Sequence, residues 1–506
     1  MQDSSLVQSV LKNNKKLEII SFSCNCIYEG ILNEWKSISP ESRMKLAQSL
    51  HNLVFQLSMY CFERYVRNEM REFAYVVNKL AGTIAFLALQ ANEGVSLMQT
   101  IIRHSIANEE WLEQKNSNPT DTTTSMQNVK EASELWCNLQ VLNAFALELR
   151  QHHVDIKIIQ DTSQKVAQEH RPTLLKILSV GIIAGRNTAN VKLVQIALEC
   201  LVQWRTILQL TFVRLSEFNV LNELLLLLKP LFALTPQSSS DGGGSRDRDS
   251  EKQRSRQHLV ELLLECLKMN EPNDSLQKKY QQTLQTFSTA LGAMQSILQE
   301  AIRAQQHEII RSIAQLICGF AEAETKFIAE GAPSCLKIVQ MILDCTSYPK
   351  TAISEMTFDF WMSLQDIAVA NRHANLQQPV YSRLLTVLLA YPIDPEELSE
   401  YSRYRQVSAD LFVCIFQLLQ EDFMLCVSSQ MKELFQKLSE PKTMTSEILT
   451  QIESCYFALS MIGQEISFTI EQNDSYKALV VKYIKPVCQS TFKSNLHQCY
   501  VQNINV

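Results

Sequence analysis

Apolar residues recur every three or four positions in the stretch YQQTLQTFSTALGAMQSIL, Tyr280–Leu298. The recurring positions are Tyr280, Leu284, Phe287, Leu291, Met294 and Leu298. This period places one apolar face along a helix, whereas a half-buried strand alternates every second residue. The same spacing runs through Leu193–Leu208 and Ile353–Ile367, and no comparable alternating run occurs. The sequence therefore predicts a succession of amphipathic helices.

The composition agrees with an all-helical chain. Glycine and proline number 12 and 13 among 506 residues, or about 5%, against a usual share of about 12%. Turn-rich β-sandwiches and α/β enzymes with glycine loops need more glycine than this. Apolar residues make up 46% and charged residues 20% of the chain, which excludes wholesale disorder.

The net charge narrows the classes of partner. Lysine and arginine number 47 against 53 acids, which gives −6 and a sequence pI of about 5.9. A mildly acidic chain is no general binder of polyphosphate, so direct binding of nucleic acid is not expected. The balance suits basic protein partners, because complementary charge guides encounter. The alternative is that this charge only keeps the chain soluble.

Cysteine usage and hydropathy favour a reducing compartment and no membrane insertion. The chain has 14 cysteines, and Cys200, Cys318 and Cys414 lie inside apolar helical stretches. This placement is typical of reduced, buried thiols in the cytosol or nucleus rather than of a disulfide framework. The N-terminal MQDSSLVQSVLKNNKK lacks the apolar core of a signal peptide. The most apolar stretch, around Leu224–Leu228, is bounded by charged residues and is too short for a span of roughly 20 residues.

Caps and linkers divide the chain. Ser39-Pro40-Glu41 and Asp394-Pro395-Glu396-Glu397 are typical helix starts, each with a capping residue, a proline and an acid in the first turn. Most breaks between helices are short, which predicts antiparallel neighbours. Two longer breaks, Lys115–Ser125 and Thr235–Gln257, are polar. We expect the second to be an exposed, disordered insert, either a plain linker or a segment that binds a partner or is phosphorylated.

A succession of amphipathic helices over 506 residues predicts a solenoid. A single core stops growing near about 250–300 residues, and stacked helical pairs bury their faces on their neighbours instead. At roughly 40–47 residues per HEAT or armadillo unit, the chain holds about eleven or twelve repeats. The expected fold is thus an all-α, right-handed α-solenoid of divergent HEAT-like repeats.

No catalytic, metal or cofactor site is predicted. Cys24 and Cys26 lack a second pair at zinc-finger spacing, and His152-His153 are adjacent rather than one helical turn apart. Gly181-x-x-x-Gly185-Arg186 lacks the remainder of a phosphate loop and is expected at a helix end. Gly242–Gly244 lies in the polar insert and follows no strand. An enzyme is therefore the least favoured class.

The five tryptophans are expected in the core. They are spread along the chain, mostly within or at the ends of apolar helical faces: Trp35, Trp111, Trp136, Trp204 and Trp361. The alternative is that some lie at ridges between helices and form shallow pockets for Phe-containing peptides.

The order of segments in the second half resembles the transportin-3 and importin-13 branch of the importin-β (karyopherin-β) family. The segments, in order, are IIRSIAQLICGFAEAETKFI (Ile309–Ile328), FDFWMSLQDIA (Phe358–Ala368), PVYSRLLTVLL (Pro379–Leu389), the acidic linker IDPEELSEYSRYR (Ile393–Arg405) and VSADLFVCIFQLL (Val407–Leu419). No single segment is diagnostic, and the common order carries the resemblance.

The first part of the chain is similar to the importin-β N-terminal domain. The matching segments are SFSCNCIYEGILNEW (Ser21–Trp35), ISPESRMKLAQSL (Ile38–Leu50) and YVRNEM (Tyr65–Met70). Members of the family are usually longer, so we expect an N-terminal portion or a short form. The C-terminal arch that the family associates with cargo lies beyond the resemblance.

The resemblance implies a function and a set of partners. It implies an importin-type nuclear transport receptor, shuttling between nucleus and cytoplasm, that binds Ran in its GTP form, Phe-Gly nucleoporins and protein cargo that is basic or Arg/Ser-rich. It also implies domains: 1–125 as an importin-β N-terminal-like, Ran-binding arch, 126–234 as HEAT-like repeats, 235–257 as the disordered insert and 258–506 as further HEAT-like repeats. It implies no cofactor, and it assigns no individual partner-binding residue. The alternative is a HEAT-repeat scaffold that assembles a protein complex without transporting it, which composition and periodicity favour equally.

Overall fold

The structure, a computed structural model, describes residues 72–90, 125–150, 156–234, 244–269, 276–391, 398–438 and 446–470, with a few shorter stretches before residue 100 and residue 481. Every regular element in these ranges is a helix, and no strand occurs among them. The chain divides into two compact units, Met1–Thr283 and Leu284–Val506. The prediction of an all-helical fold is confirmed.

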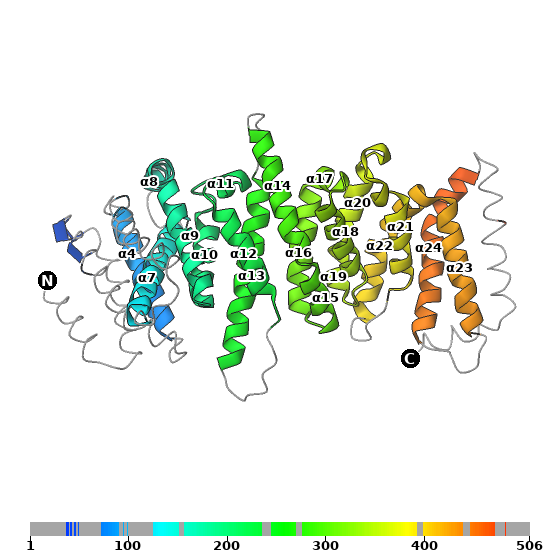
Figure 1. The fold of residues 1–506 in the computed structure, drawn as a ribbon, viewed down its shortest axis with the longest axis horizontal. Coiled ribbons are helices and arrows are strands. Elements are labelled where there is room, and N and C mark those ends of the chain that lie inside the picture. The colour runs from blue at the N-terminus through cyan, green and yellow to red at the C-terminus, as the bar shows by residue number, and fades with distance from the viewer. Residues whose placement is uncertain are drawn as a thin grey trace. The chain divides into compact units, whose positions relative to one another are not determined.

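Unit 1, Met1–Thr283, contains eight complete α-helices among its described residues. They are α4 (Glu72–Gln90), α7 (Ser125–Arg150), α8 (Ile156–Glu169), α9 (Arg171–Asn187), α10 (Val191–Trp204), α11 (Phe212–Glu217), α12 (Val220–Phe232) and α13 (Gly244–Lys268). Helix α14 (Gln277–Gly292) runs from this unit into the next. Helices α7, α9, α10, α12 and α13 pack side by side (Figure 1).

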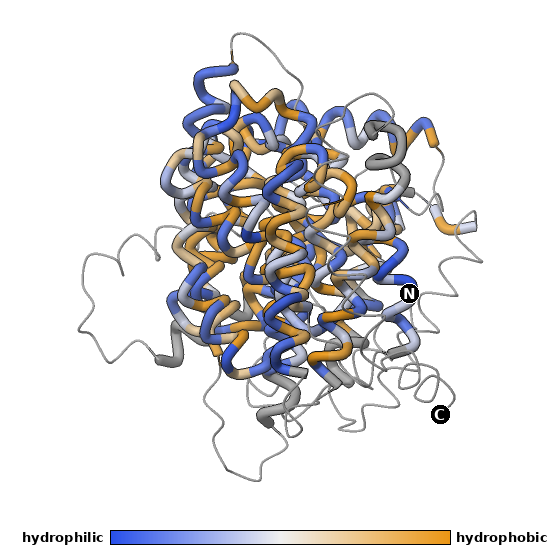
Figure 2. Tube along the Cα trace, turned by 90° about the vertical axis from the view of Figure 1, so that its right-hand side faces the viewer, coloured by the Kyte–Doolittle hydropathy of each residue, from blue (hydrophilic) through white to orange (hydrophobic). Residues whose placement is uncertain are grey.

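Unit 2, Leu284–Val506, continues the same pattern of short helices. Its elements are α15 (Gln295–Arg303), α16 (His307–Ala323), α17 (Thr325–Ala329), α18 (Pro333–Thr346), α19 (Thr351–Glu355), α20 (Phe358–Asp366), the 3₁₀ turns η4 (Val369–Asn371) and η5 (Ala374–Leu376), α21 (Gln378–Leu389), α22 (Leu398–Leu419), α23 (Glu421–Leu438) and α24 (Ser446–Ile470). Apolar residues mostly lie toward the inside of the stacked helices and hydrophilic residues toward the outside (Figure 2).

Side-chain caps start several helices. The amide of Ser42 donates to Ser39 Oγ over 3.3 Å, which confirms the predicted cap. Asn190 and Thr211 cap α10 and α11 in the same way, accepting from the amide three residues later. The predicted cap at Asp394 lies outside the described residues.

Two predicted apolar stretches are each broken into two helices. Tyr280–Leu298 divides between α14 and α15, and Ile353–Ile367 divides between α19 and α20. At the second break, Thr357 Oγ1 donates to the carbonyl of Ser354 over 2.7 Å. A hydroxyl that bonds to a nearby backbone carbonyl competes with the helical ladder, and apolar spacing does not report it.

The prediction of a disordered insert at Thr235–Gln257 is wrong for the second half of that range. Helix α13 begins at Gly244, and Ser255 and Arg256 are buried. Arg256 Nη1 donates to the carbonyl of Leu231 over 3.1 Å, so this polar stretch packs against the end of α12. Residues 235–243 lie outside the described part of the chain.

Three contacts between polar side chains join α13 to α10 at regular intervals. Lys192 pairs with Glu251 at 3.6 Å, and Glu199 pairs with His258 at 3.5 Å. Arg205, directly after α10, lies 3.7 Å from Glu261 and 3.8 Å from Glu265. The partners follow in the same order on both helices, so α10 and α13 run parallel. These charges explain why a stretch with a disordered composition becomes helical here.

The acidic linker predicted at Ile393–Arg405 is also partly helical. Helix α22 begins at Leu398, so its first two turns come from this linker. Residues 392–397 are outside the described part of the chain. The buried side chains of Tyr404 and Arg405 account for the difference, because both contact neighbouring helices.

The glycines Gly181 and Gly185 lie inside α9, six and two residues before its last residue, Asn187. A Cβ atom at Gly181 would lie 2.9 Å from Leu139 Cδ1, and one at Gly185 would lie 2.7 Å from Val194 Cγ2. Their absent side chains therefore allow α9 to approach α7 and α10 closely. The prediction of a helix end holds only for Gly185, and the pair serves packing.

Three tryptophans are in the core, as predicted. Trp136, Trp204 and Trp361 are buried, and Trp204 Nε1 donates to the carbonyl of Leu142 over 3.1 Å. Trp35 and Trp111 lie outside the described residues. In the part that the structure describes, no single helix is long and apolar enough to cross a membrane, while one bent pair, Ser399–Leu419 with Glu421–Lys437, meets the criteria of length and composition only.

Candidate functional site

An acidic row crosses α20 and α22 of unit 2. Asp359 and Asp366 are two turns apart on α20 and therefore share a face. Both are exposed, as is Asp410 on the adjoining helix α22. None of the three forms an ion pair with another described residue. Three unpaired carboxylates on neighbouring helices can attract a basic partner.

The carboxylates affect two nearby thiols, the buried Cys318 and the half-buried Cys414. Burial raises the pKa of Cys318, and Cys345, Glu322 and Asp359 raise it further. Burial also raises the pKa of Cys414, and here Asp410 and Asp366 add to the effect. Asp359 thus influences a thiol on α16, and Asp366 and Asp410 both influence a thiol on α22.

An eleven-residue loop, Ile367–Gln377, follows the acidic row and joins α20 to α21. Arg372 is 5% exposed and donates from Nε to the carbonyl of Ile367 over 2.6 Å and from Nη2 to that of Gln365 over 2.7 Å. Gln377 Nε2 donates to the carbonyls of Val369 and Arg372 over 3.1 and 2.8 Å. Two side chains therefore bind three backbone carbonyls of the irregular segment and one at the end of α20.

The loop also contacts the turn between α17 and α18 through His373. The amide of His373 donates to the carbonyl of Ala329 over 2.8 Å. Gly331 has φ +73° and lies directly against the His373 side chain, where a Cβ atom would collide with the imidazole. Glycine is required on both counts, because it tolerates positive φ and leaves room for the ring.

A buried hydroxyl cluster lies beneath α20. Trp361 Nε1 donates to Thr346 Oγ1 over 3.1 Å, and Ser354 Oγ donates to the Thr346 carbonyl over 2.7 Å. Since a serine hydroxyl carries one proton, the Tyr404 hydroxyl must be the donor in its 3.1 Å contact with Ser354 Oγ. All four residues are fully buried. The cluster joins α18, α19, α20 and α22 and leaves no free group for chemistry.

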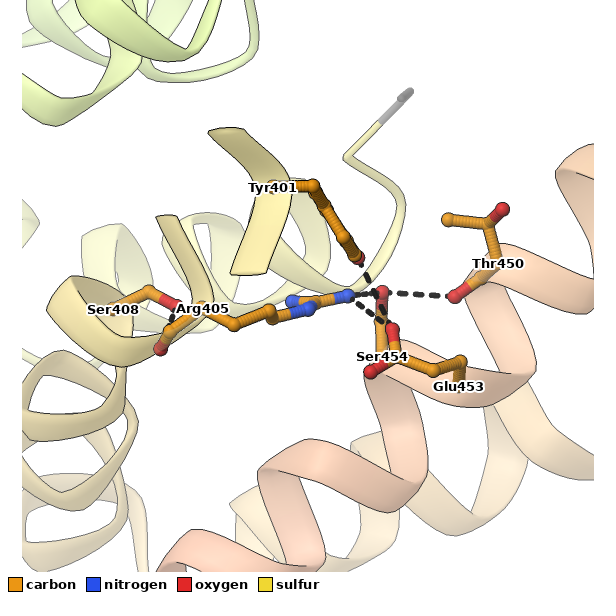
Figure 3. Close-up of polar contacts among 6 residues, drawn as sticks. All are labelled: Tyr401, Arg405, Ser408, Thr450, Glu453 and Ser454. Atoms are coloured by element: carbon orange, nitrogen blue, oxygen red, sulfur yellow. Dashed lines mark hydrogen bonds and ion pairs between the residues drawn. The ribbon is translucent and has the colours of Figure 1, made fainter. Parts of the chain in front are cut away.

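Arg405 forms a second buried joint, between α22 and α24 (Figure 3). Its Nη2 donates to Glu453 Oε2 over 2.9 Å and to Ser454 Oγ, and Tyr401 donates to the same Glu453 oxygen over 3.1 Å. The guanidinium also lies 4.7 Å from the Tyr401 ring centroid and 5.2 Å from that of Phe457. The Arg405 side chain is 7% exposed and that of Glu453 is 31% exposed, so a buried cation on α22 meets a half-buried carboxylate on α24.

The described residues hold no assembly suited to catalysis. No group of three or more metal-ligating side chains occurs among them. Burial raises the pKa of Cys266 to about 12 and that of Cys335 to about 11, so these thiols stay protonated and are poor nucleophiles. Cys24, Cys26 and His152-His153 lie outside the described part of the chain.

Sequence reasoning left the partner-binding residues unknown and missed Arg372 and Arg405. Both arginines act on groups that are distant or irregularly spaced in sequence, which periodicity does not reveal. The one available signal at the loop was its length between two apolar stretches.

Comparisons with known proteins agree with this architecture. Residues 305–391 match the family model of the transportin-3/importin-13 second TPR domain. Over 167 residues the chain is 27% identical to transportin MOS14 of Arabidopsis thaliana, an alignment that covers 28% of this chain and 17% of that protein.

Two solved structures are similar to the chain to different degrees. Importin-13 in its cytosolic state matches with a TM-score of 0.54 and 16% identity, over 81% of this chain and 46% of that chain. An engineered protein matches with a TM-score of 0.34 and 11% identity over 91% of this chain and 98% of its own, which is too low to carry an argument. The chain thus spans less than half the length of transportin MOS14 and of importin-13.

The fold is therefore that of a helical-repeat solenoid without a catalytic centre among its described residues. Residues 305–391 match the transportin-3/importin-13 domain model, and the chain is distantly similar to transportin MOS14 and importin-13. The resemblance drawn from the sequence is confirmed, and the matched domain contains both Asp359–Asp366 and the loop Ile367–Gln377.

Proposed function

We propose that this protein is an importin-type nuclear transport receptor that carries protein cargo through the nuclear pore and shuttles between nucleus and cytoplasm. The observation that carries the proposal is the transportin-3/importin-13 domain at residues 305–391. The importin-13-like solenoid over 81% of the chain supports it. Binding of Ran in its GTP form and of Phe-Gly nucleoporins belongs to the same proposal, with 1–125 as the Ran-binding arch and 126–234 and 258–506 as the repeats that follow it.

The acidic row supports a basic or Arg/Ser-rich cargo. Asp359, Asp366 and Asp410 present three carboxylates without ion-pair partners among the described residues.

A solenoid has many small interfaces, so Ran binding at one end favours a curvature that lowers cargo affinity at another. Coupling of this kind is typically about 1–3 kcal/mol.

The test is a pull-down of the full chain with Ran locked on GTP, with Ran on GDP as the control. We expect binding to the GTP form alone. A basic peptide should bind in the absence of Ran, weaken on addition of Ran-GTP, and bind less tightly to a variant with Asp359, Asp366 and Asp410 changed to Asn. Equal binding of both Ran forms, or of neither, contradicts the transport proposal and leaves a HEAT-repeat scaffold.

A further inference from the structure

Arg171 and Arg214 are two partly buried arginines of unit 1 that form no ion pair with another described residue. Arg171 is the first residue of α9, and Arg214 lies inside α11. The Nε atom of Arg171 is buried and has no hydrogen-bond acceptor in the part of the chain that the structure describes. A partly buried charge costs free energy unless an opposite charge or a hydrogen bond compensates it. Packing alone therefore does not explain why arginine occupies these two positions.

The fold brings the two arginines to the same end of unit 1. A Cβ atom at Gly185 would lie 2.7 Å from Val194 Cγ2, and one at Gly181 would lie 3.2 Å from Ala197 Cβ. Since later residues of α10 meet earlier residues of α9, these two helices run antiparallel. The start of α9 therefore lies at the end of α10, from which seven residues lead to α11 at that same end (Figure 1).

The charge of Arg214 acts on Arg171. Burial lowers the pKa of the Arg171 guanidinium, and the charge of Arg214 lowers it further. Arg214 is held in place, because its Nη1 donates to the carbonyl of Gln209 over 2.6 Å and lies 3.4 Å from Gln209 Oε1. Both guanidinium groups stay protonated at neutral pH. Folding thus sets two like charges near each other, and an anion between them would relieve their repulsion.

The acids beside these arginines are directed to other groups. Glu169 contacts His170, with its Oε2 3.9 Å from the imidazole Nε2, and its side chain is 58% exposed. His170 Nε2 is buried and has no hydrogen-bond partner among the described residues. Glu217, on α11, pairs with Lys279 at 2.8 Å. Both guanidinium groups therefore keep N–H donors for a ligand.

An acidic segment of a partner protein has the chemistry that fits this pair of cations. A guanidinium presents parallel N–H groups that match the two oxygens of a carboxylate. The chain as a whole carries −6, so the two cations reverse its charge locally, and complementary charge guides and orients a partner. From their place at one end of unit 1, their like charges and their unused N–H donors, we propose that Arg171 and Arg214 bind an acidic segment of a partner protein, with one carboxylate against each guanidinium.

This site is separate from the acidic row and does not rest on the proposed transport function. The row lies in unit 2 and attracts basic partners, whereas the two arginines lie in unit 1 and attract acidic ones. Failure of Ran to bind leaves the arginine site standing, and failure of an acidic peptide to bind leaves the transport proposal standing.

The experiment measures the fluorescence anisotropy of short labelled peptides with the full chain. An acidic peptide alternates Glu and Asp with Gly and Ser, and a neutral counterpart has Gln and Asn at the acidic positions. A third peptide has one phosphoserine and no carboxylate side chain. The site variants are Arg171→Gln, Arg214→Gln and Arg171→Lys. The matched control is the double variant Arg303→Gln, Arg311→Gln, which removes two exposed arginines of unit 2 that have no ion-pair partner among the described residues.

We expect the acidic peptide to bind the parent and the control equally well, and the neutral peptide to bind neither. Arg171→Gln and Arg214→Gln should each weaken binding on the order of tenfold, because each loses charge-assisted hydrogen bonds. Arg171→Lys should keep only part of the affinity, because an ammonium group lacks the planar fork. The melting temperature of Arg171→Gln should match that of the parent, since the guanidinium has no described partner within the chain.

Several results overturn the proposal. An equal loss of affinity in the control indicates general attraction by charge, and full affinity in both glutamine variants places the binding elsewhere. Tighter binding of the phosphoserine peptide makes a phosphate the occupant. A parent that does not bind the acidic peptide has no such site. A lower melting temperature of Arg171→Gln with unchanged peptide affinity assigns its guanidinium to folding.

Discussion

The Tyr404 hydroxyl donates to Ser354 Oγ inside a fully buried cluster. Ser354→Ala leaves this hydroxyl and the Thr346 carbonyl without their partner, which should lower the free energy of unfolding by about 1–3 kcal/mol. Tyr404→Phe removes the other end of the bond. Because a double variant leaves fewer buried groups unpaired, it should cost less than the sum of the two single variants. Chemical denaturation of the four proteins measures this, and strict additivity would show that the bond is absent.

Trp361 tests whether the aromatic residues serve packing or recognition. It is fully buried, its ring centroid lies 6.3 Å from that of Tyr381, and its indole donates to Thr346. Trp361→Ala should lower the free energy of unfolding by roughly 3–5 kcal/mol. Trp361→Phe keeps most of the apolar area and loses the hydrogen bond, so its cost should be nearer 1 kcal/mol. Full thermal stability of Trp361→Ala together with loss of a partner would instead identify a recognition residue.

Two glycines should respond to alanine in opposite directions. Gly331 has positive φ and faces His373 directly, so Gly331→Ala should destabilise unit 2 by about 1–3 kcal/mol. Gly463 lies inside α24, and an added Cβ atom there meets nothing within 4 Å. Gly463→Ala should therefore stabilise the protein by about 0.5–1 kcal/mol. Thermal unfolding compares the two, and equal shifts would show that φ and space at Gly331 do not matter.

At the scale of the element, charge pairing between α10 and α13 makes a specific prediction. Lys192 and Glu251 have side chains only 13% and 19% exposed. Lys192→Glu sets two carboxylates against each other and should cost about 1–2 kcal/mol, and the further change Glu251→Lys should recover more than half of it. The control is Lys268→Glu beside Glu265, an exposed pair at 68% and 38%, where the change should stay below about 0.5 kcal/mol. Failure of the double variant to recover stability would contradict the pairing.

Helices were predictable where an apolar face is continuous, as in α10 and α16, because burial of that face follows from spacing alone. The break between α19 and α20 was not predictable from spacing, because it depends on the Thr357 hydroxyl, which donates a hydrogen bond to the carbonyl of Ser354. The beginning of α13 was not predictable either, because this part of the helix is stabilised by Lys192 of α10 and by the carbonyl of Leu231. The conformation of the loop Ile367–Gln377 depends on Arg372, whose acceptors are the carbonyl of Ile367 in the loop and that of Gln365 at the end of α20.

At the scale of the whole molecule, buried thiols in both units predict a loss of stability in alkali. Burial raises the pKa of Cys266 in unit 1 and of Cys455 in unit 2 from 9.0 to about 12. Above pH 9 the unfolded chain releases these protons while the folded chain keeps them, so the free energy of unfolding falls as pH rises. Between the two pKa values each thiol contributes about 1.4 kcal/mol per pH unit.

The melting temperature should therefore stay level between about pH 7 and 8.5 and fall from pH 9 to 11. Circular dichroism at a series of pH values measures the profile. Cys266→Ala should give a shallower decline than the parent, whatever its stability at neutral pH. A decline of the same steepness in this variant would show that the Cys266 thiol does not ionise on unfolding.

The order of charges along α10 also disfavours a shifted pairing of α10 with α13 while the chain folds. Lys192 and Arg205 each meet a carboxylate on α13, and Glu199, which lies between them, meets the imidazole of His258. If α13 slid by seven residues toward either end, Glu199 would face Glu265 or Glu251. Neighbouring helices in a stack present similar apolar faces, so hydrophobic contact alone tolerates such a shift, whereas facing carboxylates repel. The charges of Lys192, Glu199 and Arg205 therefore favour one alignment of α10 and α13, although their apolar faces alone would tolerate others.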